Sequence, residues 1–194
     1  IMEEFVSGHD AFGQKVFHSP LYGAWWKDLV QEETGGPTSL ASAKHRFASF
    51  FLPLSRICGN MPQMVKLCHK VALVLGQAGD WAGQLLGNFS GRKAALLAMA
   101  TDAAATCCEL TRSLDAEDAD ISLLGSQVQH FAHSIQALFY SERVVELPTF
   151  TREVCHSLRN QAIPILHNGI AREVTITDED IRYAFAVKIG RAHV

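Results

Sequence analysis

The sequence has 194 residues, 48% of them hydrophobic, and a formal net charge of −3 at pH 7. A chain of this length can bury one ordinary hydrophobic core, so we expect a single domain. The slight acidic excess and the lack of a basic run argue against a nucleic-acid-binding protein, which needs a clustered positive surface.

The length of the apolar stretches and the number of cysteines indicate where in the cell the protein is expected. The longest apolar stretch begins at Ala94, is interrupted by Asp102, and falls short of the roughly 20 apolar residues that span a bilayer. We therefore expect no membrane segment. The five cysteines form no CxxC motif and are odd in number. This usage predicts reduced thiols in a cytoplasmic protein.

The end of the chain reads differently from the rest. The last six residues, IGRAHV, match the translation of a common sequencing adapter in one reading frame. We therefore expect residues 189–194 to be a foreign tail, and residues 1–188 to be one helical domain from a longer protein. We also expect the tail to make no specific packing contacts, so that His193 is not buried. Without Lys188 and Arg191, 15 basic and 20 acidic residues leave a net charge of −5.

The first helix pattern covers residues 21–33. Ser19 is a good N-cap, and Pro20 suits the first helical position, where its missing N–H costs nothing. The sequence TGGP at 34–37 ends this helix. A second helix is predicted after Thr38, over residues 39–51, with Pro53 breaking or bending it.

A third helix begins near Asn60 with Pro62 in its first turn, and its apolar residues recur at spacings of three and four. A short helix is expected from Asp80. The longest helix follows Ser90, and its apolar periodicity runs to residue 114 and places Asp102 on the polar face.

Two further helices are predicted over residues 119–141 and 149–165, the second bent at Pro164 and ended by HNG at 167–169. Only residues 172–177 look extended, and Thr177 with the acidic residues after it starts a last helix. The sequence therefore predicts an all-α fold, an irregular or orthogonal bundle of about seven or eight amphipathic helices, with at most one short extended segment near 172–177.

The N-terminal segment GHDAFGQKVFHSP, residues 8–20, contains an adjacent His and Asp, then a Lys and a further His. This arrangement resembles the metal-dependent HD-domain phosphohydrolases, which are all-helical and hydrolyse phosphate esters. The resemblance implies a divalent metal that activates water. It also implies a phosphate contact at Lys15 and metal ligands at His9, Asp10 and His18, closed by Asp80 or Asp102.

A second candidate site precedes the longest helix. The sequence GNFSGRKA, residues 87–94, places Gly91, Arg92 and Lys93 at a helix start. Free N–H groups and the positive end of the helix dipole favour an anion there. The alternative is an ordinary helix cap with two solvated cations.

A third candidate is the aromatic cluster LYGAWW. Successive helical residues diverge, so Trp25 and Trp26 do not both face one core. An exposed tryptophan beside Tyr22 is typical of an interaction hot spot.

Taken as a whole, the pattern favours a helical protein–protein interaction or scaffold module without a cofactor, because amphipathic helices are spread evenly and no convincing catalytic set is present. The partner is then another protein or a second copy. One alternative is the HD-type phosphohydrolase, which would need a divalent metal. The other alternative is a structural protein that self-assembles, as a helical coat component does.

Overall fold

The computed structural model describes residues 1–41, 50–115, 120–140 and 143–191, with side chains as far as residue 187. Its α-helices are α1 (Phe12–His18), α2 (Pro20–Glu33), α3 (Phe51–Gly59), α4 (Met61–Leu75), α5 (Asp80–Asn88), α6 (Gly91–Leu114), α7 (Leu124–Ile135), α8 (Phe150–Asn160) and α9 (Asp178–Arg191). Its strands are β1 (Ile163–His167) and β2 (Ile170–Val174). Single π or 3₁₀ turns are η1 (Glu3–Ser7), η3 (Gly76–Gly79), η4 (Ile121–Leu123), η5 (Gln136–Tyr140) and η6 (Arg143–Val145).

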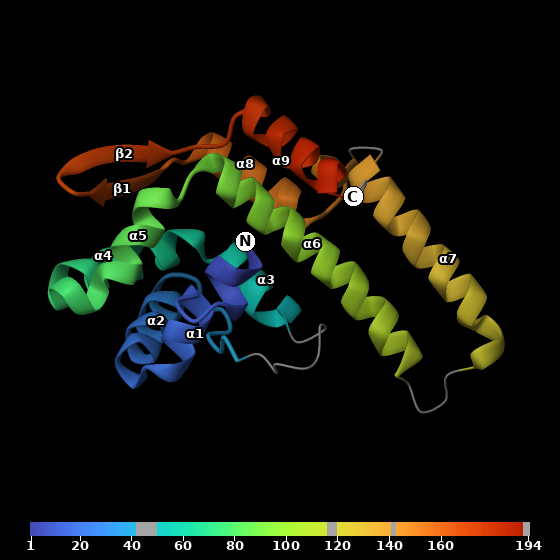
Figure 1. Ribbon diagram of the computed structural model, residues 1–194, viewed down its shortest axis with the longest axis horizontal. Coiled ribbons are helices and arrows are strands. Elements are labelled where there is room, and N and C mark those ends of the chain that lie inside the picture. The colour runs from blue at the N-terminus through green and yellow to red at the C-terminus, as the bar shows by residue number, and fades with distance from the viewer. Residues whose placement is uncertain (42–49, 116–119, 141–142, 192–194) are drawn as a thin grey trace.

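The described residues are mainly helical with one two-stranded sheet, which confirms the predicted all-α fold. In Figure 1, α6 runs through the middle of the molecule, with α1 and α2 at one side. The β1–β2 hairpin, α8 and α9 lie along the opposite side (Figure 1). One cluster of buried side chains extends in sequence from Phe5 to Phe185.

Helix starts follow the local signals in the sequence. The Ser19 side chain accepts a hydrogen bond from the Tyr22 N–H (3.3 Å), and Pro20 is the first residue of α2. Pro62 lies in the first turn of α4. Thr149 caps α8 by accepting from the Arg152 N–H (3.1 Å). Because a cap satisfies a donor that the helix itself cannot, these boundaries depend on only a few neighbouring residues.

The prediction that Pro53 breaks or bends a helix is wrong. Pro53 is the third residue of α3, which runs on to Gly59. A proline in the first turn costs no hydrogen bond, because the N–H groups there have no partner within the helix. Most of the predicted 39–51 helix, from 42 to 49, lies outside the described residues.

The predicted helix bend at Pro164 is also wrong. Pro164 lies in β1, which pairs antiparallel with β2 in the register Ile163↔Val174 to His167↔Ile170. Asn168 and Gly169 form the turn with φ values of 51° and 76°. An Asn-Gly pair with two positive φ angles is the favoured two-residue turn of a hairpin, so this pair ends a strand and not a helix.

The assignment of Asp102 to a polar face is the third correction. Asp102 is only 5% exposed and lies in the buried part of α6. Its carboxylate accepts hydrogen bonds from the N–H groups of Phe150 and Thr151 (both 2.9 Å) and from the Thr151 hydroxyl (2.6 Å). These are the first residues of α8, so one buried carboxylate joins the middle of α6 to the positive end of a second helix.

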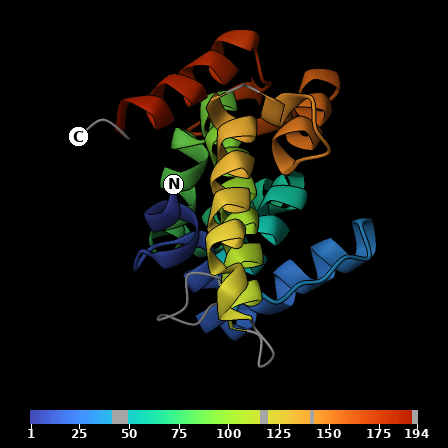
Figure 2. The ribbon, with the colours of Figure 1, turned by 90° about the vertical axis from the view of Figure 1, so that its right-hand side faces the viewer.

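α6 is also the one helix in the described part of the chain that is long and apolar enough, by length and composition alone, to cross a membrane. Half of that apolar window is buried inside the fold. Beyond Cys108 no residue of α6 is buried, and there it packs with α7 as an antiparallel pair. We call residues 103–114 of α6 together with α7 the arm. Figure 2 shows α7 in front of α6, on the outside of the molecule.

Candidate functional site

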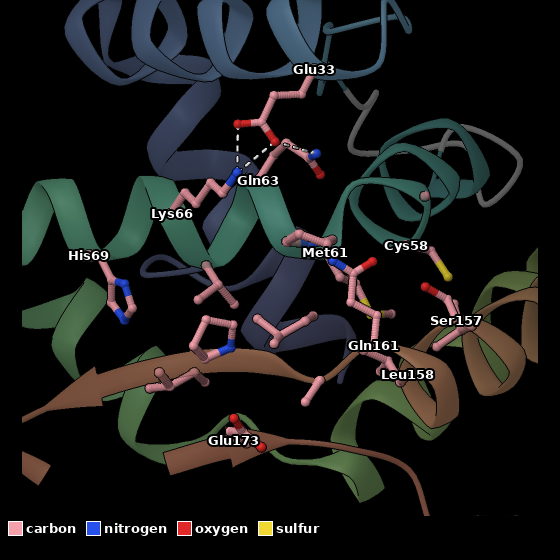
Figure 3. A pocket seen from close by; sticks show the side chains of 18 of the residues that line it. Glu33, Cys58, Met61, Gln63, Lys66, His69, Ser157, Leu158, Gln161 and Glu173 are labelled. Atoms are coloured by element: carbon pink, nitrogen blue, oxygen red, sulfur yellow. Dashed lines mark hydrogen bonds and ion pairs between the residues drawn. The ribbon is translucent and has the colours of Figure 1, made fainter. Parts of the chain in front are cut away.

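A large groove opens between α4 on one side and α8 with the β1–β2 hairpin on the other. It has a volume of about 1210 Å³ and is lined by residues of α2, α3, α4, α8, β1 and β2. Figure 3 shows α4 above β1, with the side chains of Met61, Leu158 and Gln161 between them. This volume is somewhat above the range of roughly 300–1,000 Å³ that is typical of pockets for one small molecule.

The floor of the groove is apolar because the amphipathic faces of its elements meet there. Met61 and Val65 of α4, Leu158 of α8, and Ile163 and Ile165 of β1 line the groove and are almost fully buried. The alternation of β1, with Ile163 and Ile165 inward, produces one wall. A ligand would therefore gain most of its binding energy from contact with aliphatic side chains.

An ion pair closes the upper wall of the groove. Lys66 Nζ lies 2.7 Å from both carboxylate oxygens of Glu33, and Gln63 Nε2 donates to Glu33 Oε2 at 3.1 Å (Figure 3). The hydrogen bond from Lys66 lowers the pKa of Glu33. The contact joins the end of α2 to α4, and it neutralises the lysine within the protein.

A histidine closes the end of the groove at β1. The Leu166 N–H donates to His69 Nε2 at 3.1 Å, so this ring nitrogen carries no proton and the neutral ring is the form that accepts. Burial lowers the pKa of His69, which also favours the neutral ring. The next residue along the same edge of β1, Pro164, has no N–H. The β1 edge that faces the groove therefore offers carbonyl oxygens and no free donor.

Two buried thiols lie on helices that form the groove, Cys58 on α3 and Cys155 on α8. Burial raises the pKa of Cys58 far above its usual range and that of Cys155 to about 11. A thiol reacts through its thiolate, which these pKa values suppress at neutral pH. Both side chains fill the core.

The residues of the predicted phosphohydrolase site do not gather. His9 and Asp10 lie on the surface, where Asp10 binds Lys15 Nζ (2.7 Å) and His9 Nδ1 (3.2 Å). The hydrogen bond from Lys15 is the main reason that the pKa of Asp10 is lowered. His18 pairs with Gln14. Among the described residues no group of three His, Cys, Asp or Glu side chains is arranged to hold a metal, so Asp80 does not complete a set.

The predicted anion site at the start of α6 is filled by the protein itself. A Cβ on Gly91 would lie 2.0 Å from the Thr175 carbonyl oxygen, so the chain before α9 covers this helix start. Arg92 binds Glu179 and Asp180 at 2.7 and 3.1 Å, and Lys93 binds Glu4 at 2.6 Å. These carboxylates take the place that an external anion would occupy.

The aromatic cluster divides as its spacing predicts. Trp26 is buried, and its Nε1 donates to the Thr38 carbonyl at 2.8 Å. Trp25 is half-buried beneath Lys70, whose Nζ lies 4.4 Å from the ring centroid. Tyr22 packs against Trp25 and Trp81. The cluster therefore covers α4 and α5, with Trp25 as its more exposed member.

The arm exposes a second surface. Leu124 and Val128 of α7 are 43% and 46% exposed, and Ile121, in the 3₁₀ turn just before α7, is 85% exposed. None of the residues of α7 is buried. One neighbouring helix, α6, is too narrow to cover an apolar stripe of this width.

Sequence reasoning did not find the groove, because its residues come from six elements and no local motif marks them. Comparisons of this chain with protein-family models, with curated proteins and with solved structures found no match.

Proposed function

We propose that this protein is a helical interaction module that pairs with a second copy of itself through α7. The observation that carries the proposal is the composition of residues 121–140. This surface segment contains no Lys, Arg, Asp or Glu. It exposes Ile121, Leu124 and Val128. Interface centres are depleted of charged residues, whereas a solvated helix normally carries them.

The absence of charge favours a second copy as the partner. Two identical surfaces repel each other when each carries net charge, and an uncharged stripe avoids this cost. Two antiparallel helix pairs that bury their stripes against each other form a four-helix bundle, which is a common arrangement. A two-fold contact of this kind closes at two copies, unlike the open-ended assembly of a coat protein.

The test is a charge substitution in the stripe. Leu124→Glu combined with Val128→Glu brings like charges together across a two-fold contact, and should weaken self-association about a hundredfold in analytical ultracentrifugation. Leu73→Glu is the matched control, because Leu73 is 86% exposed on α4 and lies outside the arm. This variant should associate as the unmodified chain does.

A mixing experiment separates pairing from a loss of folding. Leu124→Lys with Val128→Lys should also be monomeric alone, and equal amounts of the Glu and Lys variants should form a heterodimer through opposite charges. A chain that is monomeric at high concentration, or two variants that do not recombine, would contradict the proposal.

A further inference from the structure

We propose that the groove between α4, α8 and β1 binds a small apolar molecule that carries a protonated amine. The groove residues lie outside the arm, so this site does not depend on pairing through α7. Three features define the ligand: the apolar floor, the charges that remain unpaired at the rim, and the backbone groups that β1 presents.

The cations at the rim are already engaged. Lys66 is held by both oxygens of Glu33. Arg172, on β2, donates to the carbonyl oxygens of Leu86 and Gly87 at the end of α5, where the helix dipole is negative. Neither side chain is therefore set to receive an anionic ligand.

The carboxylates at the rim are not all engaged. Glu153 and Glu173 both line the groove, and the side-chain carboxylate of neither has an ion-pair or hydrogen-bond partner among the residues that the structure describes. Gln63 Oε1, in the groove wall, is likewise a buried acceptor without a donor in the described chain. The groups without partners are thus acceptors, and two of them are anionic. A ligand that donates hydrogen bonds and carries positive charge complements them.

The hydrogen-bonding groups at the edge of β1 do not suit an extended peptide as the ligand of the groove. A peptide that adds to a strand edge needs alternating donors and acceptors from that edge. Pro164 has no N–H, and the Leu166 N–H is already bonded to His69. The free carbonyl oxygens of this edge can accept from an ammonium group instead. A molecule with an aliphatic body and an amine head group therefore suits the groove better than a peptide strand.

Three probes of equal chain length test the ligand class. Decylamine and decanoate, below their micelle concentrations, and decanol, below its solubility limit, can each be titrated into the full chain and followed by calorimetry. We expect decylamine to bind roughly fivefold to tenfold more tightly than decanol, and decanoate to bind more weakly than decanol, since exposed charge pairs act weakly but add. Equal affinities, or a preference for decanoate, would overturn the assignment.

Two variants locate the site. Glu153→Gln combined with Glu173→Gln should reduce decylamine affinity to that of decanol and leave decanol binding unchanged. Gly59 lines the groove, and a Cβ there would meet no heavy atom within 4 Å, so Gly59→Phe should fill the groove and abolish binding of both probes.

Leu73→Phe is the control, because Leu73 is 86% exposed on α4 and belongs neither to the groove lining nor to the arm. This variant should bind decylamine as the unmodified chain does. If a folded Gly59→Phe variant, verified by circular dichroism, still binds decylamine, the probe occupies another place and the proposal is wrong. If the Gln variant keeps its preference for the amine, the carboxylates do not select the ligand and the proposal fails equally.

Discussion

At the scale of single residues, Asp102 has the largest structural role. Its carboxylate is buried and accepts three hydrogen bonds from the start of α8. A buried carboxylate is stable only when such donors replace water. This residue therefore fixes α8, and with it one wall of the groove, to the core helix.

Asp102→Ala should lower the free energy of unfolding by about 3 kcal/mol, because it leaves the first donors of α8 buried without an acceptor. Urea unfolding measures this change. Asp28→Ala is the matched control, since Asp28 is exposed on α2, and it should change stability by less than about 0.5 kcal/mol. Equal effects of the two substitutions would show that the hydrogen bonds to Asp102 contribute little.

His69 should make stability depend on pH. Folding lowers its pKa, so the unfolded chain binds more protons than the folded chain once the pH falls below the unfolded value of about 6.5. The contribution of neutral His69 to the free energy of unfolding is therefore present in full above that pH and is lost progressively as the pH falls below it. Protonation also removes the acceptor for the Leu166 N–H.

The measurement compares urea unfolding of the unmodified chain and of His69→Leu between neutral pH and pH values of about 5. The difference between the two stability curves should shrink as the pH falls. Leu73→Gln, an exposed substitution on α4 that involves no titratable group, should leave the slope unchanged. Parallel curves for His69→Leu and the unmodified chain would contradict this role of the histidine.

At the scale of the elements, the hairpin depends on its turn. Gly169 has a φ of 76°, and a Cβ there would meet no atom within 4 Å, so Gly169→Ala introduces backbone strain without a clash. We expect a loss of about 1 kcal/mol in urea unfolding.

Gly125→Ala is the control, and we expect it to change the free energy of unfolding in the opposite direction. Gly125 is helical and also has open space around it, so alanine should stabilise the chain by about 0.5–1 kcal/mol. Two losses of similar size would mean that the positive φ of Gly169 is not the cause.

At the scale of the whole molecule, the sequence predicts the features that depend on a few neighbouring residues, such as the starts of helices. Caps such as Ser19 and Thr149 mark helix starts because the bond they make closes within three residues. Asp102 was misassigned because periodicity places polar side chains outside, whereas its partner Thr151 lies 49 residues further along the chain. The Asn168–Gly169 pair marks a hairpin turn in the sequence itself, whereas Pro164 is compatible with either a bent helix or an edge strand, so the sequence around it does not distinguish the two.

The groove could not be predicted from local patterns either, because it depends on contacts between residues far apart in the sequence. Leu166 and His69 are 97 residues apart, and their contact exists only once α4 and β1 pack together. α9 extends to Arg191, and His193 lies outside the described residues, so the expectation about its burial stays a prediction.

α6 is a single helix of 24 residues, which corresponds to a length of about 36 Å. Its first half is held in the core, while its second half carries α7 outward (Figure 1). The hydrogen bonds of Asp102 to α8 lie at the middle of the helix, where its buried half meets the arm. A tilt of about 10° at this contact would move Leu114, about 18 Å further along, by roughly 3 Å. A change in the angle of α6 at this contact would therefore displace the tip of the arm more than any residue nearer to the core.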